Sequence, residues 1–80
     1  MKVTVYPTNQ APKTVEVSTF TDLQKLVGGY IEVAKSTNMG DLLVNEEGLL
    51  LNLSRNKHYP YLVGAVILAP SGWDELPYGN

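Results

Sequence analysis

The residues best suited to chemistry lie in one polar stretch in the second half of the chain. Two cations, an amide, an imidazole and two phenol rings follow one another there: Arg55, Asn56, Lys57, His58, Tyr59 and Tyr61. Cations beside aromatic rings can bind a phosphate or stack on a base. We therefore regard these six residues as a candidate site for a nucleotide or another anionic metabolite. The competing interpretation is a solvated loop, with Asn56 bonded to nearby backbone and the tyrosines packed at its base.

Glu46 and Glu47 form a second candidate site, because paired carboxylates can transfer protons. Such catalysis favours a buried carboxyl group, however, and neighbouring turn residues are usually solvated. Asn45 before the pair and Gly48 after it are typical of a turn. We therefore expect Glu46 and Glu47 to be turn residues that present an acidic patch to a partner protein.

Large apolar side chains near the carboxyl end form a third set: Trp73, Leu76 and Tyr78. Trp and Tyr are enriched in the hot spots of protein interfaces, so these residues can anchor a partner. Alternatively, they fold back and cover a leucine-rich face of the sheet that would otherwise be exposed. A third alternative is self-association through that face, which would give a two-fold homodimer.

The chain carries no recognisable pattern for a catalytic residue, a metal site or a cofactor. It has no cysteine, and its single histidine, His58, cannot form a multi-histidine metal site. Ser54 and Ser71 have no triad context. The sequence therefore favours a protein without enzymatic activity. A hydrolase is the weakest alternative, because it would need a pocket that the sequence does not locate.

Composition and charge narrow the class of protein further. Eighty residues, 44% of them hydrophobic and 18% charged, are typical of one small globular domain. Six Lys and Arg against eight Asp and Glu give a net charge of -2, which argues against nucleic-acid binding. The longest apolar run, residues 61–70, is too short to cross a membrane, and the alternating amino-terminal residues do not resemble a signal peptide. We therefore expect a soluble intracellular protein.

Hydrophobic spacing predicts the elements that position these residues. Residues 2–6 and 13–17 alternate in polarity, which predicts an antiparallel pair of strands. Thr21 and Gln24 fit a capping box ahead of a short helix, and Gly28-Gly29 ends that helix. Residues 30–33 then form a strand, and residues 35–40 a polar loop.

The second half of the chain is predicted to contain a hairpin and a central strand. Residues 41–45 and 49–53 flank the Asn45–Gly48 turn, with Gly48 in the left-handed position. Both faces of this hairpin carry leucines, so one face can pack under the helix while the other needs a cover. The apolar run over residues 62–68 is typical of a strand buried on both sides.

Together these elements predict an α+β fold, with a five- to six-stranded mixed or antiparallel sheet and one short helix packed on one face. The order along the chain is β-β-α-β-β-β, with one domain over residues 1–70. Residues 71–80 form a tail that is either packed on the sheet or mobile. The expected core comprises Val3, Val5, Val15, Val17, Leu23, Leu26, Val27, Ile31, Val33, Leu42, Val44, Leu51, Val66 and Leu68.

Four segments carry a family resemblance. They read LQKLVGGYIE at residues 23–32, NEEG at 45–48, LSRNK at 53–57 and VGAVI at 63–67. Together they resemble a family of small proteins of unknown function encoded by bacteriophages and other mobile elements, over most of the chain from Val3 to Leu68. Ser54 stands where the family has proline, and Lys57 stands where it has arginine. The resemblance implies a viral or mobile-element source and the cytoplasm of a bacterial host cell, and it transfers no catalytic residue.

Two classes of function remain open on the sequence alone. The first is a non-enzymatic interaction protein of a phage or mobile element that binds and occupies a host protein. The second is a small-ligand module that sequesters a nucleotide or similar anion at the Arg55 stretch. Burial of Trp73 would direct attention to the Arg55 stretch, whereas its exposure would favour the protein-partner function.

Overall fold

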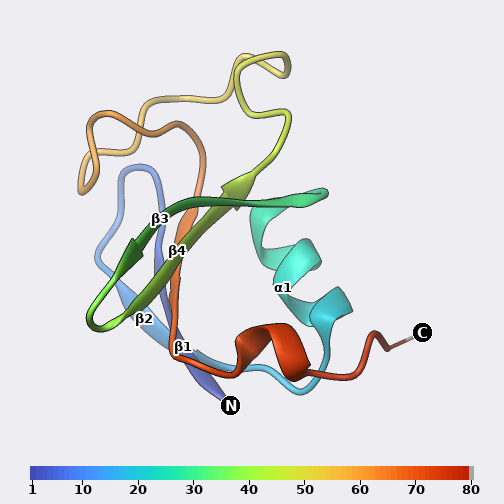
Figure 1. The fold of residues 1–80 in the computed structure, drawn as a ribbon. Coiled ribbons are helices and arrows are strands. Elements are labelled where there is room, and N and C mark those ends of the chain that lie inside the picture. Colours follow the sequence, from blue (N-terminus) through green and yellow to red (C-terminus); the bar gives the residue numbers. More distant parts are fainter. Residues whose placement is uncertain (80) are drawn as a thin grey trace.

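Five antiparallel strands form one sheet in a computed structural model that describes residues 1–79 (Figure 1). Along the chain the elements are β1 (Lys2–Tyr6), β2 (Lys13–Glu16), α1 (Phe20–Val27), β3 (Ile31–Thr37), β4 (Gly40–Asn45), β5 (Val66–Ala69) and the 3-10 helix η1 (Trp73–Glu75). The predicted α+β fold, with one short helix and an antiparallel sheet, is confirmed. Asn80, the last residue of the predicted tail, lies outside the described residues.

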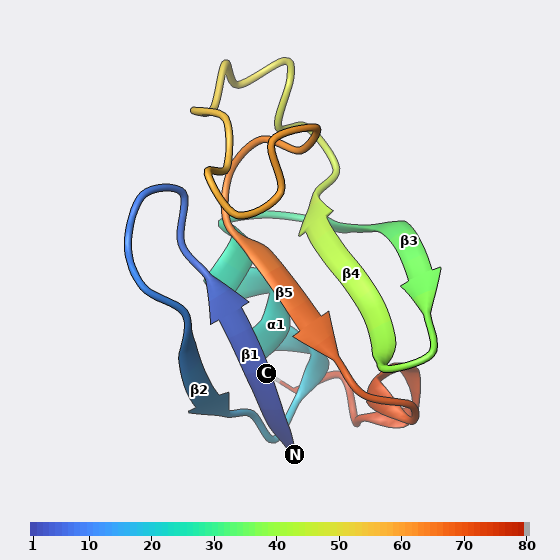
Figure 2. The ribbon, with the colours of Figure 1, turned by 90° about the vertical axis from the view of Figure 1, so that its left-hand side faces the viewer.

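The strand order in the sheet is β2-β1-β5-β4-β3, so the last strand of the chain occupies the centre (Figure 2). Ile67 of β5 lies opposite Val5 on one side and opposite Leu43 on the other. This register joins the β1–β2 hairpin to the β3–β4 hairpin. The central strand predicted over residues 62–68 is confirmed for residues 66–68; the strand continues to Ala69, and residues 62–65 belong to the preceding loop.

The hairpin predicted over residues 41–53 is wrong. β4 pairs with β3 along one edge and with β5 along the other, so it has no free edge for residues 49–53. β3 also runs further than predicted, to Thr37, and the expected loop at 35–40 shrinks to a tight turn around Asn38 and Met39. Residues 46–52 consequently form a turn-rich loop without a strand.

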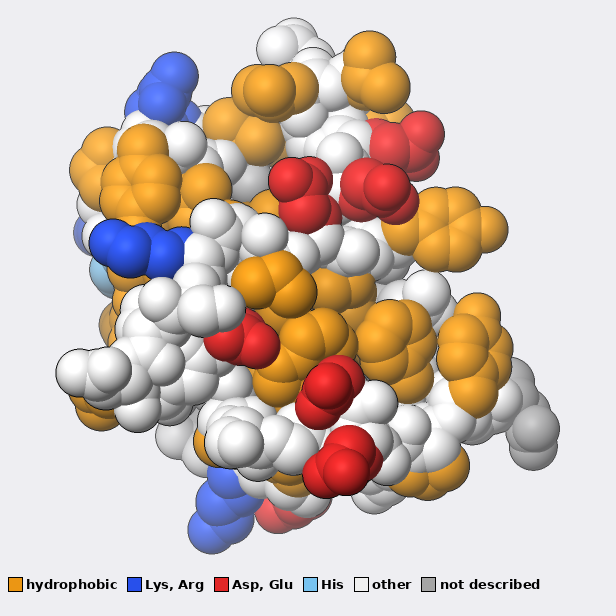
Figure 3. All heavy atoms as spheres, viewed as in Figure 1, with side chains coloured by type: hydrophobic (Ala, Val, Ile, Leu, Met, Phe, Trp, Pro, Cys, Tyr) orange, Lys and Arg blue, Asp and Glu red, His pale blue; other side chains and the backbone are white. Residues whose placement is uncertain are grey.

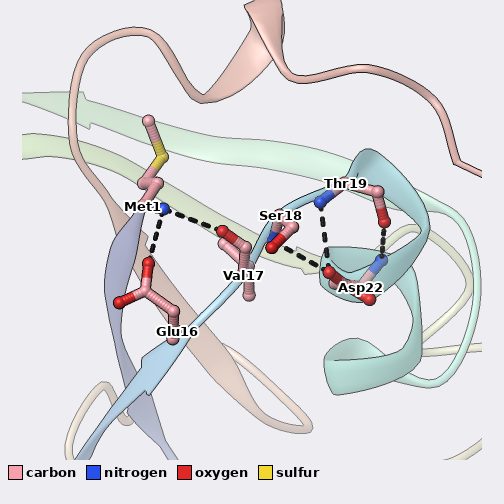
Figure 4. Close-up of polar contacts among 6 residues, drawn as sticks. All are labelled: Met1, Glu16, Val17, Ser18, Thr19 and Asp22. Atoms are coloured by element: carbon pink, nitrogen blue, oxygen red, sulfur yellow. Dashed lines mark hydrogen bonds and ion pairs between the residues drawn. The ribbon is translucent and has the colours of Figure 1, made fainter.

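The helix begins earlier than predicted, because Thr19 rather than Thr21 is its amino-terminal cap. The Thr19 hydroxyl accepts the Asp22 N–H at 3.1 Å, and the Asp22 carboxylate accepts the N–H groups of Ser18 and Thr19 (Figure 4). The Thr21 N–H instead donates to the Tyr78 carbonyl at 2.9 Å, a contact between distant segments that no local pattern indicates. At the other end, Gly28 has a left-handed φ of 82°, as predicted for the helix end.

Each face of the sheet carries a buried cluster, and the two clusters pack against different parts of the chain. On the α1 face, strand residues pack with helix residues in one cluster that includes Val3, Val5, Leu43, Ile67, Leu23 and Val27. On the opposite face, Leu42, Val44 and Val66 are covered by Tyr59 and Leu62 from the loop between β4 and β5. The predicted need for a cover on the second face is therefore met by this loop rather than by the tail.

Two residues of the predicted core are exposed, and among residues 1–79 three buried hydrophobic residues lie outside it. Val33 is 43% exposed because β3 is an edge strand, and Leu51 is 55% exposed because it lies in the turn-rich loop. The buried hydrophobic residues outside the predicted core are Leu43, Ile67 and Ala69. Strand alternation requires this result, because Leu43 and Ile67 face α1 once β4 and β5 pair in the observed register.

Candidate functional site

The buried side chain of Asn45 sets the course of the chain as it leaves β4. Its amide nitrogen donates to the Val27 carbonyl at the end of α1 at 3.1 Å, and its amide oxygen accepts the Glu47 N–H at 2.7 Å. The Gly48 N–H donates to the Asn45 carbonyl at 3.1 Å. The predicted turn after Asn45 is thus present, although Gly48 does not have the positive φ that a bulged hairpin would require.

Residues 46–52, which we call the leucine loop, are held by hydrogen bonds within the loop and to the residues next to it. The Leu51 N–H donates to the Glu47 carbonyl, the Asn52 N–H to the Leu49 carbonyl, and the Leu53 N–H to the Gly48 carbonyl. These bonds close successive turns and leave the side chains of Leu49 and Leu50 pointing outward, each 84% exposed. Figure 3 shows hydrophobic side chains gathered over this loop at the top of the view, with acidic side chains beside them.

A groove of about 550 Å³ lies between the leucine loop, the start of β3 and the end of the loop before β5. Its walls are formed by Glu32 and Ala34 of β3, by the leucine loop and by residues 61–63. Val44, which is buried, and Leu62, which is half-buried, also line it. Apart from Tyr61, the groove's ionisable lining residues are Glu32 and Glu46, both exposed. The groove is therefore mainly apolar, with carboxylates from two separate segments beside it.

Gly48 is needed where the loop passes over residues 61–63. A Cβ atom at Gly48 would lie 2.9 Å from Cγ2 of Val63 and 3.3 Å from the Asn45 carbonyl oxygen. The absence of a side chain lets the leucine loop lie directly against this segment. The same close approach brings Leu49 and Leu50 to the groove that Tyr61 and Leu62 also line.

The six residues of the Arg55 stretch are in one loop, but they do not form one accessible site. Asn56 is fully buried, and its amide nitrogen donates to the carbonyls of Tyr6 and Gly64 at 2.8 and 3.0 Å. Its amide oxygen accepts the N–H groups of His58 and Tyr59 at 2.8 and 3.1 Å. The bonds to His58 and Tyr59 are the nearby backbone contacts that the solvated-loop interpretation expects, but the Asn56 side chain is buried and also binds Tyr6, which is distant in sequence.

The other members of the stretch divide between contacts with the protein and exposure to solvent. The Arg55 guanidinium donates to the Pro60 carbonyl, and Nε2 of His58 lies 2.6 Å from the Gln10 carbonyl oxygen. The Tyr59 ring packs edge-on against Tyr6, with 5.1 Å between centroids, and burial raises the pKa of the Tyr59 hydroxyl. Lys57 and Tyr61 are exposed, and Tyr61 also lines the apolar groove.

The predicted partner-binding residues lie at opposite ends of β4. Glu46 and Glu47 follow its last residue, whereas the Trp73 indole N–H donates to the Asp41 carboxylate near its start at 2.8 Å. Trp73 and Leu76 pack partly buried against the α1 side of the core. Phe20 stacks between Trp73 and Tyr78, with centroids 6.3 and 5.8 Å away, and Tyr78 is 65% exposed.

The tail segment also supplies a second, more polar cleft of about 270 Å³ next to Trp73 and Asp41. The Trp73 indole and the Ser36 hydroxyl both stabilise the charged carboxylate and lower the pKa of Asp41. Among residues 1–79, no group of three His, Cys, Asp or Glu side chains is placed to hold a metal ion. Within the same residues, no helix has the length and apolar character needed to span a bilayer.

Sequence reasoning missed Leu49, Leu50 and Glu32 as residues of a candidate site. The consecutive leucines were interpreted as a strand, and Glu32 belongs to a strand that is far from the leucine loop in sequence. An available signal was the lack of alternation in Leu49-Leu50-Leu51, which is unusual for a strand with one face in water. The juxtaposition with Glu32 and Tyr61 depends on tertiary structure alone.

Comparison with known proteins assigns the chain to a family. The family model described as "Domain of unknown function (DUF3846)" matches residues 1–76. No curated protein and no solved structure matches the chain. The prediction that the chain is a member of a family of unknown function is confirmed at that level. With nearly its whole length matched by the model, this protein belongs to the DUF3846 family.

Proposed function

We propose that this protein acts by binding another protein through the groove and the leucine loop, without catalysing a reaction itself. The observation that carries the proposal is the 84% exposure of both Leu49 and Leu50 beside an apolar groove. Contiguous exposed apolar surface in a small soluble domain marks an interaction site. Complete burial of a leucine side chain contributes about 1.5–3 kcal/mol, so these two residues alone can contribute substantially to binding.

The folding role of the leucine loop does not account for these side chains. Leu53, which directly follows the loop, packs near Gly48 and Gly64, so it anchors the loop to the protein. Leu49 and Leu50 instead remain in water, where they contribute little to the folded state. Their retention at the surface is explained by a partner that covers them.

The partner we propose is a protein of a bacterial host cell, and the source we propose is a phage or another mobile element. The motif resemblance over residues 23–67 supports this source. It also supports the bacterial cytoplasm as the place of action. The acidic net charge of -2 is consistent with a protein partner rather than nucleic acid.

A pull-down from bacterial lysate tests the proposed function. The baits are the wild-type protein, the Leu49→Ser/Leu50→Ser variant, and a Met39→Ser control. Met39 is 77% exposed and lies in the β3–β4 turn, at the other end of β4. We expect a protein that both the wild type and the control retain and that the leucine variant loses. Equal retention by all three baits, or no retained protein, would contradict the proposal.

A nucleotide or similar anion at the Arg55 stretch is the second candidate function. It is favoured by the ring cluster of Tyr6, His58 and Tyr59, with Tyr61 edge-on to Tyr59 and Lys57 exposed nearby. The partly buried Trp73 also directs attention to this stretch, but internal hydrogen bonds already occupy the side chains of Asn56 and Arg55, so we favour the groove. A thermal-shift screen against nucleotides distinguishes the two, since a ligand at a hundred times its Kd stabilises by about 2.7 kcal/mol. Full binding by the Arg55→Ala and Lys57→Ala variants would exclude this site.

A further inference from the structure

We infer that the groove recognises a partner segment that carries bulky apolar side chains next to lysine or arginine. This inference rests on the proposed function and adds the chemistry of the partner. Two properties of the groove point to it: an apolar lining that continues into exposed leucines, and carboxylates on two of its walls.

The apolar part of the segment is required by the lining. Val44 of β4 and Leu62 of the loop before β5 form its inner part, and Leu49 and Leu50 extend the surface outward. A volume of about 550 Å³ is sufficient to accept a bulky apolar side chain. An apolar side chain in the groove and another against the leucines would both leave water.

The lysine or arginine of the partner segment is inferred from the negative charge beside the groove. Glu32 comes from β3 and Glu46 from the leucine loop, and the groove lining contains no Lys, Arg or His. Glu47, also exposed, follows Glu46 in the loop. A cation of the partner next to the apolar anchor would interact with these carboxylates, whereas an acidic segment would be repelled.

The same charges argue against a second copy of this chain in the groove. A two-fold interface here would bring Glu32 and Glu46 towards their own counterparts. Pairing of two β3 edges is also disfavoured, because the pairing of β3 shifts register between Val33 and Lys35. Such a bulge, with a lysine beside it, blunts an edge strand against addition of another strand.

Binding of three short fluorescein-labelled peptides, followed by fluorescence anisotropy, tests the inference. One peptide combines leucines with lysines, the second combines the same leucines with glutamates, and the third replaces the leucines with serines and keeps the lysines. We expect the leucine–lysine peptide to bind at least about tenfold more tightly than either of the others. Its affinity should fall as salt is raised, because exposed charges are screened over about 10 Å at 0.1 M ionic strength.

Matched variants separate the two components. Glu32→Gln/Glu46→Gln should bind the leucine–lysine and leucine–glutamate peptides with nearly equal affinity, whereas Leu49→Ser/Leu50→Ser should lose binding to both. The control Asp74→Asn/Glu75→Gln removes two exposed carboxylates outside the groove and should preserve the wild-type preference. Circular dichroism of each variant establishes that it is folded before its affinity is compared.

Several results would overturn the inference. These are no binding of the leucine–lysine peptide, equal binding of the serine–lysine or leucine–glutamate peptide, or unchanged preference in Glu32→Gln/Glu46→Gln. A dimer of the wild type in sedimentation, lost in the leucine variant, would assign the groove to a second copy and overturn it too.

The lysate experiment separates failure of the inference from failure of the proposed function. If the retained protein depends on Leu49 and Leu50 but not on Glu32, Glu46 or salt, the protein-binding function stands and the inferred chemistry fails. If the leucine variant retains the lysate protein and also binds the peptides as the wild type does, both fail.

Discussion

Two buried asparagines hold the irregular parts of the chain against the sheet. Asn45 connects the end of α1 to the start of the leucine loop, and Asn56 connects the loop before β5 to Tyr6 and Gly64. Each amide both donates and accepts, so a single side chain satisfies backbone groups from separate segments. At the scale of the residue, this explains how loops without regular structure adopt one position.

Replacement of Asn56 by alanine should lower the free energy of unfolding by about 3 kcal/mol, because buried backbone groups at both ends of the amide lose their partners. Chemical denaturation with urea measures the change. Lys57→Ala is the neighbouring control, and its exposed side chain should change stability by less than about 0.5 kcal/mol. Equal stability of the two variants would show that the amide does not hold the loop.

At the scale of the element, the segments that pair with β4 determine which leucine-rich segment forms a strand. The leucine loop fails to become a strand because β3 and β5 occupy both edges of β4. Leucines only a few residues apart in sequence therefore have opposite environments: Leu43 is fully buried and Leu50 is 84% exposed.

The effect of a leucine-to-alanine substitution on stability should depend on whether the leucine is buried or exposed. Leu43→Ala should lower the free energy of unfolding by about 2–5 kcal/mol, since it leaves a cavity between the sheet and α1. Leu50→Ala should change it by less than about 0.5 kcal/mol, because the side chain is in water in the folded state. Thermal and urea unfolding of both variants provide the comparison, and a large loss for Leu50→Ala would place that side chain in the core.

The tail is an element that tertiary contacts hold in place. The carbonyls of Pro77 and Tyr78 accept the first N–H groups of α1, and the Trp73 indole of η1 donates to the Asp41 carboxylate. These contacts satisfy backbone donors that a helix leaves free at its start. The partly buried Trp73 and Leu76 extend the core on the same side.

Trp73→Phe should raise the pKa of Asp41 towards its ordinary value of 3.8, because the phenyl ring cannot donate the hydrogen bond that favours the carboxylate. The ring remains available to stack on Phe20. NMR titration of the side-chain carboxyl carbon measures the change. Asp22, whose pKa is lowered by other donors, should titrate as in the wild type and serves as the internal control. An unchanged pKa of Asp41 would exclude the indole as its cause.

At the scale of the whole molecule, three carboxylates favour the folded state at neutral pH. The Met1 ammonium lowers the pKa of Glu16, with 2.7 Å between nitrogen and oxygen (Figure 4). Backbone N–H groups of Ser18 and Thr19 lower the pKa of Asp22, and Trp73 and Ser36 lower that of Asp41. Each carboxylate is on a different element, so the effect concerns the fold as a unit.

Stability should therefore fall as the solution is acidified. The folded-state pKa values lie below the ordinary values of 4.5 for Glu16 and 3.8 for Asp22 and Asp41, so the unfolded chain binds more protons in this window. Their contribution is present above the ordinary pKa values and is lost as the pH falls through the folded-state values. Urea unfolding at a series of pH values measures this slope, which Asp22→Asn should reduce. Constant or rising stability on acidification would contradict the assignment.

Much of the fold could be predicted where the determining residues are close in sequence. Alternation over residues 2–6 and 13–16 and the glycine at residue 28 each act within one short segment. The cap at Thr19 could not be distinguished from Thr21, because both have a suitable residue three positions later. The Arg55 stretch was found as a loop, but the internal bonds of Asn56 reach Tyr6, fifty residues away.

Local residue chemistry by itself determined the α+β class, the helix with its glycine end, and the presence of a buried strand near residues 66–69. Tertiary structure alone decided that β5 fills the centre of the sheet, that the tail caps α1, and that Leu49 and Leu50 face water beside Glu32. The physical reason is that a strand edge or a sheet face can be occupied only once. Which distant segment occupies a given edge or face depends on the relative stabilities of all the alternative pairings. A short stretch of sequence does not determine these stabilities.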